Sequence, residues 1–322
     1  MDSLEVDIYR RYQSLVGMSC ALDLQRCATL DLQKSAAPVP QKVFLSQIIN
    51  RYDAFCFDGY GTLYNRGTFV YPGAKEWFSA LREAGKQLRL VTNAASNVDA
   101  VLAAEACARG FDFTAEETIS SGSLLKAYVR DGGYWPEGSL SESASSCREV
   151  YYIGRPTGVN VLAECGISAV ENPLSPVVAV SSSTATDAMY SHAVQILQRP
   201  GAMLLVLNSD AWAPNIDGTR SPVSGALSER LRRDSACERN GFVCCKTEYF
   251  GKPFPAIWER VKSSLPNGSR VLMIGDTLGT DVFGAMVAGF DSALVVGRNV
   301  PAADLESDER ALKIRPTYYL EP

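Results

Sequence analysis

The sequence predicts an α/β protein in which a parallel sheet is combined with a second, smaller α/β domain. Three observations predict this fold. Short apolar runs alternate with stretches of helical spacing, which is typical of parallel βαβ units. The chain has 322 residues, more than one average domain contains. Residues 131–149 begin Asp-Gly-Gly-Tyr-Trp-Pro and continue as a Ser-rich run, so they form a natural hinge between two domains.

The elements are expected in three blocks: an extension at residues 1–48, a core at 49–132 and 247–322, and the smaller domain at 133–246. The extension has helical spacing over residues 6–16, and a second helix is predicted over residues 21–32. In the core we expect strands and helices at residues 52–57, 73–84, 87–92, 98–109, 271–274 and 293–296. In the smaller domain we expect them at residues 150–153, 177–180, 187–198, 203–207 and 226–236.

The composition is that of an ordinary globular protein, with 46% hydrophobic and 21% charged residues. A net charge of −5 without a basic cluster argues against nucleic acid as a partner. We find no apolar run of about 18 residues and no signal-peptide layout, so no membrane partner is expected. Nine cysteines without metal-ligand or disulfide-framework spacing predict a cytoplasmic, reducing location. Zinc is disfavoured, because His192 is the only histidine.

The most informative segment is Asp58-Gly-Tyr-Gly-Thr, which follows the apolar run Ala-Phe-Cys-Phe. The apolar run reads as a buried strand, so Asp58 is expected at its carboxyl end, the edge where open α/β sheets bind ligands. Neighbouring glycines allow backbone N–H groups to approach a ligand. This arrangement suits an aspartate nucleophile that attacks phosphorus or carbon.

The segment resembles the first motif of the haloacid dehalogenase superfamily, Asp-x-Asp-Gly-Thr. Three more motifs follow in the family's order: Leu-Arg-Leu-Val-Thr-Asn at residues 88–93, Gly-Lys-Pro at 251–253, and Met-Ile-Gly-Asp-Thr-Leu-Gly-Thr-Asp at 273–281. The long insertion between the second and third motifs is similar to the class IIA branch, which holds p-nitrophenylphosphatase-like and sugar-phosphate phosphatases. The resemblance therefore implies a Rossmann-like core with an inserted α/β cap domain.

Residue roles follow from the same resemblance. Asp58 is the expected nucleophile, and Lys252 is expected to neutralise charge between Asp58 and the phosphoryl group. Thr92, together with the backbone N–H groups of Gly59 and Asn93, is expected to bind the phosphoryl oxygens. Simpler interpretations stay open, because a threonine at a strand end can merely cap the following helix.

The resemblance also implies a Mg²⁺ site formed by Asp58, Asp276 and the backbone carbonyl of Tyr60, since hard cations prefer oxygen ligands. Asp281 is expected either to orient a metal-bound water or to steady Lys252. Alternatively, Asp281 is only a negative charge at the start of a helix.

Tyr60 departs from the family pattern, because phosphatases of this superfamily carry a second aspartate there as general acid and base. A phenol has an unperturbed pKa near 10, so at neutral pH it donates a proton but accepts one poorly. We therefore expect a phosphatase with slow hydrolysis of the aspartyl-phosphate. Transfer of the phosphoryl group to an acceptor other than water stays open, and so does loss of catalysis with Tyr60 filling the entrance.

Two other functions remain as alternatives. Tyrosine also occupies this position in 2-haloacid dehalogenases, in which the aspartate displaces halide from carbon. Against that function, Asp276 is retained here, and the dehalogenase cap lies between the first two motifs, where this chain has no room. The other alternative is a non-catalytic protein that binds a phosphorylated ligand.

The sequence says little about the substrate beyond a small phosphorylated molecule. Asn208, Asp210 and the loop over residues 211–222 are candidates for substrate binding, because cap loops choose the substrate in class IIA enzymes. Within that loop Arg220 can meet a second anionic group or remain a solvated surface residue. A homodimer is an expectation from the family alone. The extension at residues 1–48 either packs on the core or contributes to a dimer contact.

Overall fold

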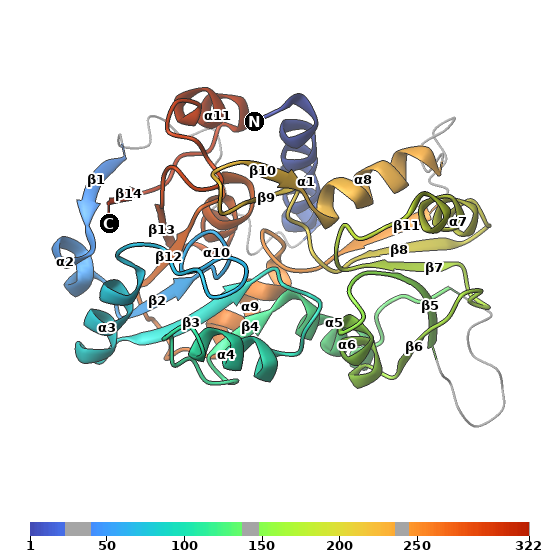
Figure 1. Cartoon of the computed structure of the whole chain (residues 1–322), viewed down its shortest axis with the longest axis horizontal. Helices are drawn as coiled ribbons and strands as arrows, with labels where there is room; N and C mark the ends of the chain where they lie inside the picture. The colour runs from blue at the N-terminus through green and yellow to red at the C-terminus, as the bar shows by residue number, and fades with distance from the viewer. Residues whose placement is uncertain (23–39, 137–147, 236–244, 322) are drawn as a thin grey trace.

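The computed structural model describes residues 1–22, 40–136, 148–235 and 245–321. Two parallel sheets lie side by side, each covered by helices (Figure 1). The predicted α/β fold class is therefore confirmed. Most of the helix predicted over residues 21–32 falls outside the described residues, as does most of the Ser-rich part of the predicted hinge.

The larger sheet has seven strands, and every neighbouring pair in it is parallel. Its order is β1 (Gln41–Phe44), β14 (Tyr318–Glu321), β13 (Asp291–Leu294), β12 (Val271–Gly275), β2 (Ala54–Phe57), β3 (Gln87–Thr92) and β4 (Thr118–Ser120). The central strands β2 and β12 are buried along their whole length, which explains why they read as continuous apolar runs. Strands β1, β4 and β14 were not predicted.

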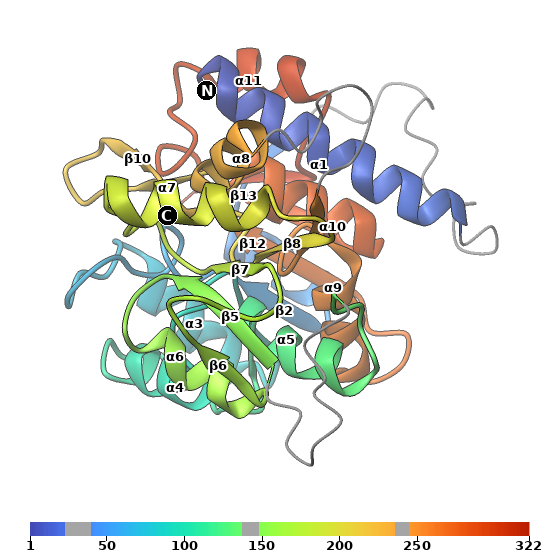
Figure 2. The ribbon, with the colours of Figure 1, turned by 90° about the vertical axis from the view of Figure 1, so that its right-hand side faces the viewer.

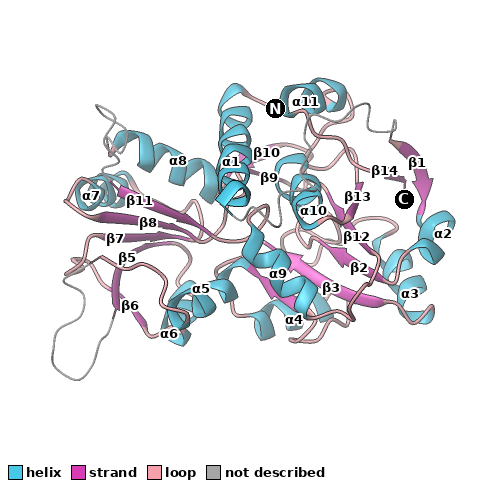
Figure 3. Ribbon diagram, turned by 180° about the vertical axis from the view of Figure 1, so that it is seen from behind, coloured by secondary structure: helices cyan, strands magenta, loops and turns pink. Residues whose placement is uncertain are grey.

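Alternate side chains of β2 enter two different apolar clusters, as the two-residue period of a strand requires. Phe55 and Phe57 pack on one face against α3 (Ala74–Glu83) and α4 (Asp99–Cys107), near α2 (Leu45–Ile48). Cys56 packs on the other face with Trp258 of α9 (Pro255–Ser263), together with α5 (Ser121–Arg130) and α10 (Phe283–Ala288). This second cluster also contains residues of the smaller sheet, among them Val150 and Val177. Figure 3 shows α9 covering the larger sheet from behind.

The smaller sheet has five parallel strands, in the order β11 (Cys245–Tyr249), β8 (Ala202–Val206), β7 (Val177–Val180), β5 (Arg148–Ile153) and β6 (Ile167–Ala169). Helices α7 (Asp187–Leu197) and α8 (Ser224–Asp234) pack on one face, and Leu162 of α6 (Gly158–Glu164) lies in the cluster on the other. A short hairpin, β9 (Trp212–Pro214) and β10 (Arg220–Pro222), follows β8. Because β11 reaches Tyr249, this sheet runs past residue 246, and the domain boundaries stay a prediction.

The N-terminal helix α1 (Ser3–Leu22) packs against α8 and against α11 (Leu305–Leu312). Figure 2 shows it as the long blue helix running across the molecule beside both of these helices. The helical spacing predicted over residues 6–16 is thus confirmed. Of the two roles considered for the extension, α1 packs on the rest of the chain. None of the helices within the described ranges is both long and apolar enough to cross a membrane.

Candidate active site

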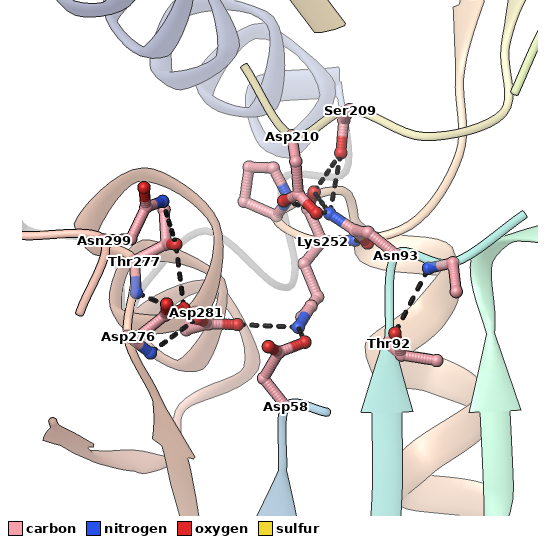
Figure 4. A network of polar contacts seen from close by, with 12 residues as sticks. Asp58, Thr92, Asn93, Ser209, Asp210, Lys252, Asp276, Thr277, Asp281 and Asn299 are labelled. Carbon is pink, nitrogen blue, oxygen red and sulfur yellow. Dashed lines mark hydrogen bonds and ion pairs between the residues drawn. The ribbon is translucent and has the colours of Figure 1, made fainter. Parts of the chain in front are cut away.

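Three adjacent strands bring the predicted site residues to one edge of the larger sheet. Asp58 follows β2, Asp276 follows β12 and Thr92 ends β3, and β2 pairs directly with the other two strands. The backbone N–H of Asp58 donates to the carbonyl of Ile274 at 2.9 Å, which continues the pairing of β2 and β12 as far as Asp58. Figure 4 shows these side chains converging above the strand ends.

The ammonium group of Lys252 joins two carboxylates. Its Nζ lies 2.6 Å from Asp58 Oδ1 and 2.7 Å from Asp281 Oδ1, as the dashed lines in Figure 4 show. The lysine side chain is only 1% exposed. Burial lowers the pKa of Lys252, but the two carboxylates more than offset this and hold the pKa above its ordinary value. Lys252 is therefore a fixed positive charge in the site.

The nucleophile candidate has a perturbed carboxyl group. Burial raises the pKa of Asp58 to about 7, against the opposing charge of Lys252. Burial also raises the pKa of Asp276, and the charges of Asp58 and Asp281 add to that rise. These groups lie close enough to repel one another, so a cation among them would favour their ionised forms.

The donor set fits a divalent cation. Asp58, Asp276 and Asp281 are buried and offer carboxylate oxygens that all lie within 4.8 Å of one another. Among the described residues, Asp276 Oδ2 has no hydrogen-bond partner although it is buried. A buried carboxylate oxygen without a donor is costly unless an ion satisfies it. Gly61 makes room here, because a Cβ at that position would lie 2.0 Å from Asp276 Oδ2.

Backbone groups hold Asp281 in place. Its Oδ2 accepts hydrogen bonds from the backbone N–H groups of Asp276, at 3.1 Å, and Thr277, at 3.0 Å. The hydroxyl of Thr277 donates to Asp276 Oδ1 at 3.1 Å and accepts from Asn299 Nδ2 at 2.8 Å. Asp281 thus pairs with Lys252 on one oxygen and caps the loop of the fourth motif with the other.

Asn93 ties the second motif to the third and to the smaller sheet. Its Oδ1 accepts from the backbone N–H of Lys252 at 2.7 Å, and its Nδ2 donates to the Lys252 carbonyl at 3.0 Å and to Asp210 Oδ1 at 2.8 Å. Burial raises the pKa of Asp210 to about 6, with Lys252 opposing. Asn208 Oδ1 accepts from the backbone N–H of Asp210 at 2.9 Å. From the sequence, only the backbone N–H of Asn93 was expected to take part in the site. The hydrogen bonds of its side-chain amide were not predicted.

Thr92 and Gly59, both expected to bind phosphoryl oxygens, lie in different surroundings. The Thr92 hydroxyl accepts from the Ala94 N–H at 3.2 Å, and Thr92 lines the same cavity as Asp58. Gly59 lies against Tyr64, because a Cβ added to Gly59 would meet the Tyr64 hydroxyl at 2.7 Å. Gly59 therefore allows a close packing contact beside the nucleophile.

The phenol of Tyr60 points to a partner on α4. Its hydroxyl lies 3.3 Å from Glu105 Oε2, and its ring packs edge-on against Tyr64 with 5.1 Å between centroids. The other carboxylate oxygen of Glu105 accepts from Asn97 Nδ2 at 2.9 Å. Burial raises the pKa of Tyr60, and the charge of Glu105 raises it further. Sequence reasoning missed Glu105, since nothing marks one glutamate on the helix after the second motif.

A cavity of about 200 Å³ opens from Asp58 toward the smaller sheet. Its lining is rich in hydroxyl groups and contains two arginines, Arg66 and Arg155, that have no ion-pair partner among the described residues. The hydroxyl groups come from Ser96, Ser181, Ser182, Ser183 and Thr184. Trp212, Asn208 and Asp210 complete the side formed by the loop after β8.

One interpretation of Arg220 was that it meets a second anionic group of the substrate. The position of its side chain does not support that interpretation. Its guanidinium lies 3.1 Å from both carboxylate oxygens of Glu5 in α1, and it is absent from the cavity wall. The alternative, a solvated surface arginine, is also wrong, because the side chain is 17% exposed and ion-paired. The ion pair joins segments that are distant in the sequence, so no local pattern could have revealed it.

The matches to known families agree with this geometry. One family model, described as haloacid dehalogenase-like hydrolase, matches residues 55–168, and a second, described as HAD-hydrolase-like, matches residues 249–321. The chain belongs to the haloacid dehalogenase-like hydrolases. The two matched stretches include all four motifs, and the interruption between them lies between the second and third motifs.

Relatives of this hydrolase match along most of its length. Chronophin from Mus musculus is 26% identical over 86% of this chain and 92% of its own. A possible sugar phosphatase from Cytophaga hutchinsonii has a similar fold, with a TM-score of 0.72 at 23% identity, covering 88% of this chain and 98% of its own. The glycerol phosphate phosphatase of Mycobacterium tuberculosis, solved in complex with magnesium, reaches 0.63 at 25% identity, covering 85% and 76%.

Proposed function

We propose that this hydrolase is a Mg²⁺-dependent phosphatase of small phosphate esters, with Asp58 as the nucleophile. One observation carries the proposal: Lys252 Nζ contacts both Asp58 and Asp281, while the adjacent Asp276 Oδ2 lacks any donor among the described residues. A fixed cation beside a carboxylate nucleophile, with a second acidic position left for a metal ion, is what phosphoryl transfer to aspartate requires.

The first step forms a bond between an Asp58 carboxylate oxygen and phosphorus while the ester oxygen leaves with its electron pair. Lys252 stabilises the negative charge that develops on the transferred group. Thr92 and the backbone N–H groups of Gly59 and Asn93 bind the phosphoryl oxygens. Asp58, Asp276 and the backbone carbonyl of Tyr60 would hold Mg²⁺, which neutralises phosphoryl charge when bound. Asp281 keeps Lys252 oriented.

The second step, attack of water on the aspartyl-phosphate, is proposed to be slow because Tyr60 occupies the general acid and base position. Its phenol can donate a proton to the leaving oxygen but accepts one poorly, and burial with the nearby Glu105 raises its pKa further. The contact between the Tyr60 hydroxyl and Glu105 Oε2 supports this proposal, since the phenolic proton already has a carboxylate acceptor. Persistence of the intermediate also permits transfer to acceptors other than water.

The cavity supports a small and polar substrate. A volume of about 200 Å³ beside Asp58 suits a compact molecule, and the serine residues of the lining offer hydroxyl groups for hydrogen bonds. Arg66 and Arg155 in the same lining can bind a negatively charged part of the substrate. Asn208 and Asp210 remain the proposed contacts from the loop after β8. The magnesium-bound relative acts on glycerol phosphate, which is compatible with such a cavity.

A reducing, cytoplasmic location also remains part of the proposal. Cys56 and Cys165 are free thiols in buried positions, which is ordinary for proteins of reducing compartments. Burial raises the pKa of Cys56 to about 12, so this thiol stays protonated and unreactive. A homodimer remains a prediction.

Release of p-nitrophenol from p-nitrophenyl phosphate tests the proposal. We expect release that needs Mg²⁺, stops on chelation with EDTA, and disappears in Asp58→Asn, whose neutral amide cannot attack phosphorus. Undiminished release by the folded Asp58→Asn variant would contradict the assignment of the nucleophile. Binding of Mg²⁺ without any release would instead favour a ligand-binding role, and halide release from a 2-haloacid would favour carbon as the site of attack.

A further inference from the structure

Helix α1 lies outside the segments that match the family models, which begin at residue 55. Its side chains Ile8, Tyr9, Tyr12 and Val16 are nonetheless at most 2% exposed. Their spacing of one, three and four residues places them on one face of the helix. That face packs into the cluster that also contains Leu278 of the fourth motif and Val282, which directly follows the motif. An apparent appendage is therefore buried directly behind the catalytic loops.

Tyr12 contacts the segment that carries Lys252 through two aromatic rings. Its ring packs edge-on against Tyr249, with 5.3 Å between centroids, and against Phe254, with 5.2 Å. Tyr249 and Phe254 stack on each other at 4.9 Å. These two residues flank the Gly-Lys-Pro motif on its two sides, so Tyr12 holds both ends of the turn that presents Lys252.

The Tyr12 hydroxyl reaches the same turn by a second route. It donates to the Ser209 carbonyl at 3.0 Å in a fully buried hydrogen bond. The Ser209 hydroxyl in turn donates to the carbonyl of Lys252, and Asn93 Nδ2 donates to the same carbonyl. Figure 4 shows Ser209, Asn93 and the backbone of Lys252 meeting in this network. The position of Lys252 thus depends on the loop that Tyr12 holds.

Tyr9 has an equivalent relation to the fourth motif. A Cβ at Gly279 would lie 2.2 Å from Cγ of Tyr9, so the Tyr9 ring rests on the Gly279 backbone and requires glycine there. Gly279 belongs to the short π-helical segment Leu278–Val282, which also contains Asp281. The ring therefore limits movement of the loop that positions the second carboxylate partner of Lys252.

A third anchor connects α1 to the cavity wall. Glu5 is 1% exposed and pairs with Arg220 of β10 through both carboxylate oxygens. The paired strand β9 contributes Trp212 and Pro214 to the wall of the cavity. One helix thus contacts the Lys252 turn, the Asp281 loop and the hairpin beside the substrate cavity.

We propose that α1 is an internal brace of the active site, in which Tyr12 and Tyr9 are positioning residues for Lys252 and Asp281. The brace keeps the ammonium of Lys252 between its two carboxylate partners, so its loss lowers the rate of the chemical step rather than the affinity for substrate. This inference rests on the proposed phosphatase function only for the kinetic experiment that tests it. A purely structural α1 would lower thermal stability and leave the rate constants of the folded enzyme unchanged.

The variant Tyr12→Phe tests the brace, because it removes one hydroxyl group and keeps the aromatic packing. The matched control is Tyr190→Phe, which removes the hydrogen bond from Tyr190 to Asp234 Oδ2 at 2.7 Å between α7 and α8. With p-nitrophenyl phosphate and Mg²⁺, we expect the rate constant of the p-nitrophenol burst of Tyr12→Phe to fall about five-fold, the effect of one ordinary hydrogen bond. We expect the substrate concentration that gives half of the maximal burst rate to stay unchanged, and for Tyr190→Phe we expect wild-type values of both quantities.

A second variant, Tyr9→Leu, removes the ring from the Gly279 backbone. We expect weaker Mg²⁺ binding by titration calorimetry, because the loop that carries Asp281 and follows Asp276 is released. Melting temperatures establish that each variant is folded. A wild-type burst rate constant in Tyr12→Phe together with wild-type Mg²⁺ affinity in Tyr9→Leu would contradict the proposed role of α1. If the wild-type enzyme releases no p-nitrophenol, the phosphatase proposal fails. The proposed role of α1 is then tested by Mg²⁺ affinity alone, compared between the variants Tyr9→Leu and Tyr12→Phe and the control Tyr190→Phe.

Discussion

Replacement of Tyr60 by aspartate is the perturbation that most directly separates the two halves of the proposed reaction. The phosphoryl transfer to Asp58 needs little help when the leaving group is p-nitrophenolate, whereas hydrolysis of the aspartyl-phosphate needs a base for water. Wild-type enzyme should therefore show a rapid burst of p-nitrophenol followed by slow turnover. Tyr60→Asp should keep the burst and accelerate the slow phase.

The size of the effect follows from the surroundings of Tyr60. General acid and base catalysis contributes about 10²–10⁴-fold to a rate. We expect the lower end, about 10²-fold, because the charge of Asp58, two residues away in the same motif, hinders ionisation of the new carboxylate. The substitution also removes the edge contact with Tyr64 at 5.1 Å, which costs about 1 kcal/mol of stability. The melting temperature should fall slightly without loss of the fold.

Stopped-flow absorbance of p-nitrophenol measures both phases in one experiment. The matched control is Tyr60→Phe, which keeps the ring against Tyr64 and removes only the hydroxyl that contacts Glu105. Its burst should equal that of wild type, and its slow phase should not be faster. The reasoning would be refuted by a folded Tyr60→Asp enzyme whose slow phase matches that of wild type, because the base at this position would then not limit turnover.

Three further predictions concern other contacts. In Lys252→Met the burst should slow about 10²–10³-fold, as measured by stopped flow. The melting temperature should also change, because two buried carboxylates lose their cation. An undiminished burst would contradict the proposed role of Lys252. In Tyr12→Phe the melting temperature should fall by the equivalent of about 1 kcal/mol, since the Ser209 carbonyl loses its buried donor; no fall would show that another donor replaces it. Burial raises the pKa of Glu5 from 4.5 to about 7, and the charge of Arg220 opposes this rise. The protonated carboxyl therefore stabilises the folded state fully below pH 4.5, and this contribution is lost as the pH rises through 7. Glu5→Gln should therefore lose less thermal stability than wild type between about pH 5 and 8, and parallel melting curves would refute the assignment.

The core strands could be predicted because they are buried on both faces and read as uninterrupted apolar runs. This holds for β2 and β12, whose carboxyl ends lead to Asp58 and Asp276, and for β7 in the smaller sheet. The edge strands β1 and β4 were missed, and so was β14, which lies between β1 and β13. Residues in β1 are mostly exposed, so its sequence lacks the apolar signal that marks a central strand.

The site was predictable where its residues belong to short motifs at strand ends. Asp58, Asp276, Asp281 and Lys252 meet as the order of the motifs implied, because parallel strands end at one edge of the sheet. The partner of Tyr60 could not be predicted in the same way. Glu105 lies on a helix surface, where one acidic residue is not distinguishable from its solvated neighbours.

Contacts between distant segments were also beyond prediction from one sequence. Helix α1 was expected from its helical spacing, but its apolar face does not say which partner covers it. The partners are the Lys252 turn and the Gly279 backbone, and both are specified by the three-dimensional arrangement alone. The same is true of the ion pair between Glu5 and Arg220.

Detection of a phosphorylated Asp58 tests the central claim most directly. The enzyme is mixed with p-nitrophenyl phosphate and Mg²⁺, quenched in acid after one turnover, digested, and analysed by mass spectrometry. We predict a phosphate adduct on the peptide that contains Asp58, which needs Mg²⁺, appears with the burst, decays more slowly than it forms, and is absent in Asp58→Asn. Release of p-nitrophenol at the wild-type rate with no adduct at any time would contradict the account, because an aspartate nucleophile must carry the phosphoryl group.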